Sequence, residues 1–127
     1  MIKRILVIDD DEAIRKVFLL ALEGTEFQVD TAPSGAIGIE MIKEQSYDLI
    51  NIDLKMPGMN GVETLREIRK INPDTPVYIV TAFFGEFEEQ LNAAQKEDLK
   101  FELMMKPLTM SQIVSLARGI LNGAVIY

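Results

Sequence analysis

Five side chains suited to bond-making chemistry each follow directly after a short apolar run in this sequence. Asp9 and Asp10 follow the first such run, Asp53 the third, Thr81 the fourth and Lys106 the fifth. Carboxylates can bind a divalent cation or act as nucleophiles, while a hydroxyl and an ammonium can hold phosphoryl oxygens. If these residues converge, their combined chemistry is that of a phosphoryl-transfer site.

The elements that must position these residues alternate along the whole chain. Runs rich in Ile and Val predict five strands, at Arg4–Ile8, Phe27–Ala32, Asp48–Ile52, Val77–Val80 and Phe101–Met105. Apolar spacings of three and four predict helices over residues 14–22, 34–44, 60–70, 86–96 and 109–122. Strict alternation predicts an α/β fold, a doubly wound five-stranded parallel sheet with helices on both faces.

Ligands of such sheets bind beyond the carboxyl ends of the strands, where the winding reverses. If the first and third strands are neighbours, Asp9, Asp10 and Asp53 meet there. Each pair of carboxylate charges then costs roughly a few kcal/mol at an intermediate dielectric. The three carboxylates must therefore share protons or bind a cation, and Mg²⁺ suits the second outcome.

Composition limits the classes of partner and metal. Twenty acidic and 13 basic residues give a net charge of −7, which disfavours direct binding to nucleic acid or an anionic membrane. The sequence has no Cys and no His, so a metal site must use oxygen ligands. The start of the chain lacks the features of a signal peptide, and no window approaches a transmembrane span. We expect a single cytoplasmic domain, residues 1–127.

Four segments resemble the receiver domains of bacterial two-component response regulators. They are IDDD, DLKMPGMNG, TA and KP, each after the corresponding predicted strand. The resemblance covers essentially the whole chain. DLKMPGMNG and TAFFGEF look especially similar to the single-domain phosphorelay intermediates of sporulating bacilli.

The resemblance implies a CheY-like (βα)5, flavodoxin-like fold with strand order 2-1-3-4-5. It implies that Asp53 accepts a phosphoryl group from a phosphohistidine of a sensor histidine kinase or histidine phosphotransferase. Asp10, Asp53 and the backbone carbonyl of Lys55 would bind Mg²⁺, with Asp9 contacting the ion largely through water.

The resemblance also assigns the remaining site residues. Thr81 would donate a hydrogen bond to the phosphoryl group, and Lys106 would pair with its oxygens. The bond between Lys106 and Pro107 would be cis. Such a domain catalyses only its own phosphorylation and dephosphorylation, so it is not an enzyme with a separate substrate. It would switch contacts with a downstream protein or pass the phosphoryl group onward, as a monomer or a weak phosphorylation-dependent dimer.

The chain departs from the family pattern before its last strand. Leu103 stands where receivers usually carry an aromatic residue or His, and Lys96–Lys100 replaces a usual Gly-Ala pair. The family's switching geometry therefore transfers poorly here. Lys55 and Phe83 flank the expected phosphoryl site, and we hypothesise that they shield it and slow its hydrolysis.

Three other functions are compatible with parts of the pattern. A phosphohydrolase with an aspartyl nucleophile usually has a second acid where this chain has Lys55. A flavin-binding module needs a phosphate loop rich in hydroxyls and Gly after the first strand, where this chain has aspartates. A degenerate receiver could serve only as an interaction scaffold.

Two sets of apolar side chains have open interpretations. Leu19 and Leu20 extend beyond the buried stripe of their helix, which indicates either a wider core or a docking surface. Met104, Met105 and Met110 are expected to be flexible core filler, with Met110 facing inward.

Overall fold

The computed structural model describes residues 2–122. Five parallel strands form one sheet in the order β2-β1-β3-β4-β5, as the resemblance implied. The elements, in chain order, are β1 (Arg4–Ile8), α1 (Glu12–Leu22), β2 (Gln28–Ala32), α2 (Gly35–Glu44), β3 (Leu49–Ile52), α3 (Gly61–Ile71), β4 (Val77–Thr81), the 3₁₀ helix η1 (Phe84–Phe87), α4 (Glu88–Lys96), β5 (Glu102–Met105) and α5 (Met110–Leu121).

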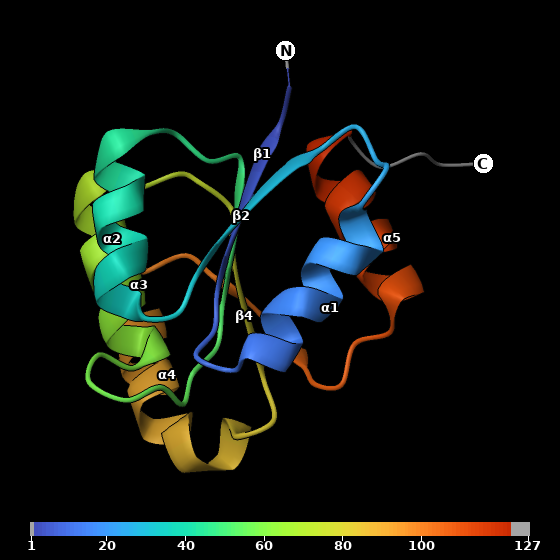
Figure 1. The fold of residues 1–127 in the computed structure, drawn as a ribbon. Coiled ribbons are helices and arrows are strands. Elements are labelled where there is room, and N and C mark those ends of the chain that lie inside the picture. Colours follow the sequence, from blue (N-terminus) through green and yellow to red (C-terminus); the bar gives the residue numbers. More distant parts are fainter. Residues whose placement is uncertain (1, 123–127) are drawn as a thin grey trace.

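Helices cover the sheet on both faces (Figure 1). α2, α3 and α4 lie on one face, and α1 and α5 lie on the other. Successive residues of the central strands therefore alternate between two cores. Leu6 and Ile8 pack beneath α2 and α3, while Ile5 and Val7 pack beneath α1 and α5. This two-sided burial explains why the strands are continuous apolar runs.

Side-chain caps fix where four helices begin. The Asp11 carboxylate accepts a hydrogen bond from the Ala13 N–H, and Ser34 caps α2 through Ile37 N–H. Asn60 and Thr109 each form a reciprocal capping box with the residue three positions later. Because α1 begins one residue after Asp11, its cap holds the end of the preceding loop, which carries Asp9 and Asp10.

The structure corrects the expectation for the methionines. Met110 is 46% exposed and Met105 is 54% exposed, so neither is core filler and Met110 does not face inward. Met110 is the first residue of α5, directly after the N-cap Thr109. Leu19 and Leu20 are 41% and 57% exposed, which excludes the wider-core interpretation and leaves the docking surface untested.

Candidate phosphoryl and metal site

The site lies at the carboxyl edge of the sheet, where β1 and β3 end side by side. Ile8 pairs with Ile52 in parallel register, so the next residues, Asp9 and Asp53, are neighbours. The Asp53 N–H donates to the Ile8 carbonyl at 2.9 Å, and the Asp9 N–H donates to the Ala32 carbonyl at 3.1 Å. The backbone hydrogen bonds of the sheet are therefore sufficient to place Asp9 and Asp53 side by side.

Three carboxylates converge at this edge, as the sequence predicted. One oxygen from each of Asp9, Asp10 and Asp53 lies within 4.8 Å of the others. Asp9 and Asp53 are buried, whereas Asp10 is exposed. Such a set of oxygens matches the ligand preference of a hard divalent cation.

Asp9 has both carboxylate oxygens satisfied. Its Oδ1 accepts from the Asp11 N–H at 2.9 Å, and its Oδ2 accepts from Lys106 Nζ at 2.7 Å. The Arg15 guanidinium donates to the Asp9 backbone carbonyl at 2.8 Å. Arg15 was not predicted from the sequence, since only the turn of α1 over the loop brings it back to Asp9. These bonds leave Asp9 little freedom to move.

Asp53 is less well satisfied. Lys106 Nζ lies 3.4 Å from its Oδ1, within ion-pair range but without hydrogen-bond alignment. Asp53 Oδ1 is thus buried with no hydrogen-bond partner among the described residues. A buried carboxylate oxygen that accepts no hydrogen bond is costly, and a metal ion bound to it would reduce that cost. This observation fits a metal ion at the three carboxylates.

The pKa values of Asp53 and Lys106 are both raised, for different reasons. Burial raises the pKa of Asp53 to about 6; Lys106 opposes this shift and the Asp9 charge adds to it. Burial lowers the pKa of Lys106, but its hydrogen bond to Asp9 and the charges of Asp9 and Asp53 raise it by more, so the net shift is upward. Lys106 is therefore a cation throughout the physiological range.

Residues from four segments line an open cleft of about 670 Å³ above the carboxylates. Lys55 and Phe83 lie on its rim, and Lys106 and Asp53 also line it. Thr81 does not line the cleft. It is fully buried at the end of β4, and its Oγ1 accepts a hydrogen bond from the Phe83 N–H at 2.9 Å. The side chains of Asp9, Asp10, Asp53, Lys55 and Lys106 thus line one cleft, whereas that of Thr81 is buried outside the lining.

The loops after β3 and β5 have the conformations that the cleft requires. The Lys106–Pro107 peptide bond is cis, as the resemblance implied. The Lys106 N–H donates to the Thr81 carbonyl at 2.9 Å, which joins the ends of β4 and β5. An added Cβ at Gly61 would lie 2.5 Å from the Asp53 carbonyl oxygen, so only glycine lets α3 approach this closely.

Comparison with known proteins decides the family. The model of the response regulator receiver domain matches residues 5–118. The chain belongs to the response regulator receiver domain family. It is 36% identical over 104 residues to the transcriptional regulatory protein ZraR of Escherichia coli strain K12, covering 82% of this chain and 23% of that protein. It is 30% identical over 119 residues to the response regulator ArlR of Staphylococcus saprophyticus, covering 94% and 52% respectively.

Solved receiver structures share the fold. A CheY-like receiver domain protein from Methanospirillum hungatei matches with a TM-score of 0.85 and 26% identity, covering 96% of this chain and 95% of that one. The response regulator TrrA of Thermotoga maritima, solved in complex with Mg²⁺ and BeF, matches with a TM-score of 0.78 and 29% identity, covering 94% and 100%. The chain spans about a quarter of the length of ZraR and about half of the length of ArlR.

No helix within residues 2–122 combines the length and apolar character needed to cross a bilayer. The closer likeness to sporulation phosphorelay intermediates stays a prediction, as does the shielding of the site by Lys55 and Phe83.

Proposed function

We propose that this receiver domain, residues 1–127, accepts a phosphoryl group on Asp53. The donor would be a phosphohistidine of a sensor histidine kinase or histidine phosphotransferase. The acceptor Oδ forms a bond to phosphorus while the bond from phosphorus to the donor nitrogen breaks, and the electron pair of that bond returns to the imidazole. The observation that carries this proposal is the buried, unpartnered Asp53 oxygen beside two carboxylates and Lys106.

Mg²⁺ is the cofactor that these residues fit: Asp10, Asp53 and the backbone carbonyl of Lys55 would hold it, and Asp9 would contact it largely through water. When bound, the ion would neutralise the crowded carboxylates and the incoming phosphoryl charge. The complex of TrrA with Mg²⁺ and BeF supports this assignment, because that relative shares the fold.

The protein's own side chains supply the remaining interactions. Lys106, held 2.7 Å from Asp9, presents an ammonium to the phosphoryl oxygens. Thr81 Oγ1 accepts a hydrogen bond from the Phe83 N–H, which leaves its hydroxyl proton free to be donated to a phosphoryl oxygen. The domain would turn over only its own aspartyl phosphate, in the cytoplasm, and would signal through an unidentified protein target or relay the group onward.

Incubation with acetyl phosphate and Mg²⁺, followed by intact-mass measurement, tests the proposal. The wild type should gain one phosphoryl group, and Asp53→Ala should gain none. Asp74→Ala is the matched control, because Asp74 is exposed and lies outside the cleft. Absence of an Asp53-dependent adduct would refute the proposal and favour the interaction scaffold.

A further inference from the structure

Four polar contacts join the segment that follows Asp53 to the segment from η1 to β5. They are Lys55 Nζ to Glu86 Oε1 at 3.2 Å, Asn60 Nδ2 to Gln90 Oε1 at 3.1 Å, Arg66 Nη2 to Glu97 Oε2 at 2.7 Å, and Arg69 Nε to the Lys100 carbonyl at 3.0 Å. α4 itself buries only Leu91 and Ala94. Phe84, Phe87 and Leu99 are also partly buried against the core on this face, and the four polar contacts add to that attachment.

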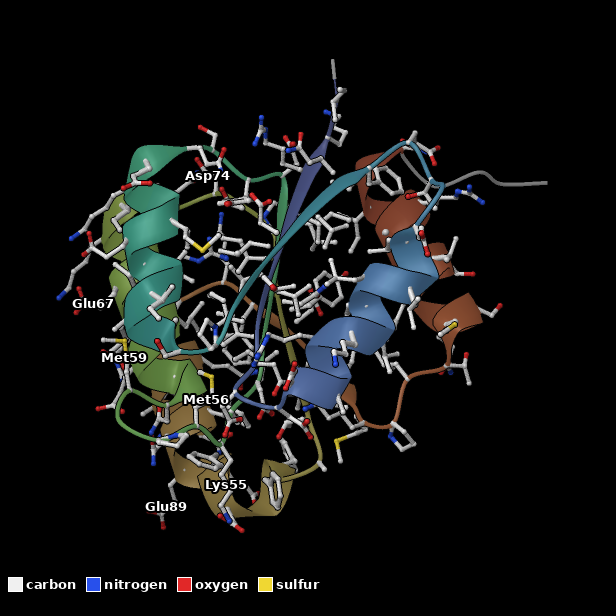
Figure 2. All side chains as sticks on the ribbon, in the orientation of Figure 1. Lys55, Met56, Met59, Glu67, Asp74 and Glu89 are labelled. Carbon is white, nitrogen blue, oxygen red and sulfur yellow. The ribbon has the colours of Figure 1, made fainter. Side chains whose placement is uncertain are left out.

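The first of these contacts differs from the others because Lys55 also lines the cleft above Asp53. Figure 2 shows Lys55 at the end of the molecule where η1 and α4 lie. Its Nζ lies 3.2 Å from Glu86 and 4.6 Å from the centre of the Phe83 ring. The Lys55 charge is thus compensated by Glu86 and Phe83 rather than by the carboxylates of the cleft.

We propose that Glu86 is a positioning residue for the phosphoryl site: it holds the Lys55 ammonium at the rim of the cleft and competes for it with an incoming phosphoryl dianion. This inference rests on the proposed phosphorylation of Asp53. A phosphoryl group carries more negative charge than one carboxylate, so it can draw Lys55 from Glu86. Entry of the donor then breaks the first of the four contacts and frees η1 at its link to Lys55.

The solvent exposure of Lys55 and Glu86 determines how strongly Glu86 can compete with a phosphoryl group for Lys55. The side chains of Lys55 and Glu86 are 52% and 54% exposed, and ion pairs this open are weak. Removing the Glu86 charge should therefore improve the apparent affinity for a small dianionic donor by roughly two- to fivefold. The maximal rate should change little, because Glu86 does not contact the acceptor. The three remaining contacts hold α4 and the residues after it, and Phe84 and Phe87 pack η1 against the core, so the variant is expected to fold.

Initial rates of Asp53 phosphorylation, measured against acetyl phosphate concentration with Mg²⁺, test the inference. Glu86→Gln should lower the half-saturating concentration by roughly two- to fivefold. Glu89→Gln is the matched control, because Glu89 is an exposed α4 glutamate that pairs with no described cation. Both substitutions are repeated together with Lys55→Gln, where the effect of Glu86→Gln should disappear.

The outcomes separate this inference from the function on which it rests. Equal shifts for Glu86→Gln and Glu89→Gln would mean that only overall charge matters, and a shift that persists with Lys55→Gln would exclude competition for Lys55. Either result overturns the inference while leaving Asp53 phosphorylation intact. A wild type without an Asp53 adduct would instead overturn the proposed function itself.

Discussion

At the scale of single residues, burial of the Asp53 carboxylate destabilises its ionised form, which is the form that the proposed role requires. Its side chain is 5% exposed, and burial is the main reason that its pKa rises to about 6 from 3.8. The folded pKa exceeds the unfolded one, so between about pH 4 and pH 6 the folded state binds more protons than the unfolded state. The stability that protonated Asp53 contributes is therefore present below about pH 4 and is lost as pH rises to about 6.

This penalty predicts that Asp53→Asn stabilises the domain when no divalent ion is present. A shift of about two pKa units corresponds to at most about 3 kcal/mol at pH 7, and the gain should shrink towards pH 4. Urea unfolding between pH 4 and pH 8 measures both effects. Asp74→Asn, at an exposed position, should change stability little. A gain that stayed constant with pH would show that Asp53 is not desolvated.

At the scale of elements, the start of α3 determines where the acceptor lies. A Cβ at Gly61 would meet the Asp53 carbonyl oxygen at 2.5 Å and Leu54 Cα at 2.9 Å, both of which are backbone atoms that cannot rotate away. We predict that Gly61→Ala destabilises the domain by about 1–3 kcal/mol and slows Asp53 phosphorylation roughly tenfold or more, since small displacements of reacting groups are costly. Thermal unfolding and the acetyl phosphate assay measure these changes.

The control for this prediction is a glycine in a helix with open space around it. A Cβ at Gly119 in α5 would meet nothing within 4 Å, so Gly119→Ala should stabilise the domain by about 0.5–1 kcal/mol through helix propensity. Phosphorylation should be unchanged in this variant. If Gly61→Ala changed stability and phosphorylation in the same way as Gly119→Ala, this would refute the close approach of α3 to Asp53.

The sequence predicted most elements because each leaves a local signal. The spacing of apolar residues differs between strands and helices, so both kinds of element could be predicted from it. η1 at Phe84–Phe87 was missed, since a short 3₁₀ turn has no period of its own. The contact of Lys55 with Glu86 was also not predicted, because it joins residues 31 positions apart, one in the loop after β3 and the other in η1.

In the candidate site, too, some placements could be predicted from the sequence and others depend on tertiary structure. Asp9 and Asp53 were predicted to meet because parallel neighbours end at one edge of a sheet. The burial of Thr81 and its hydrogen bond from the Phe83 N–H depend on the loop after β4, which sequence patterns do not specify. Nothing in the structure explains Asn51, whose buried Oδ1 has no hydrogen-bond partner among residues 2–122.

At the scale of the whole molecule, negative charge is in excess and gathers at the functional edge. The chain carries a net charge of −7, and three carboxylates lie within 4.8 Å at the ends of β1 and β3. Lys106 contacts two of these carboxylates and cannot neutralise all three. Helices cover both faces of the sheet. Repulsion between carboxylates is therefore concentrated at this edge, where the proposed phosphorylation site lies.

A cation at this edge should therefore stabilise the entire domain. We predict that Mg²⁺ at about ten times its dissociation constant raises the free energy of unfolding by about 1.4 kcal/mol, because it binds the folded state and not the unfolded chain. Thermal unfolding with increasing MgCl₂ measures the gain, and NaCl at equal ionic strength controls for screening. Asp10→Asn, which removes an exposed carboxylate of the cluster, should reduce the Mg²⁺ response. Equal stabilisation by NaCl and MgCl₂ would show that the carboxylates respond to ionic strength and hold no specific ion.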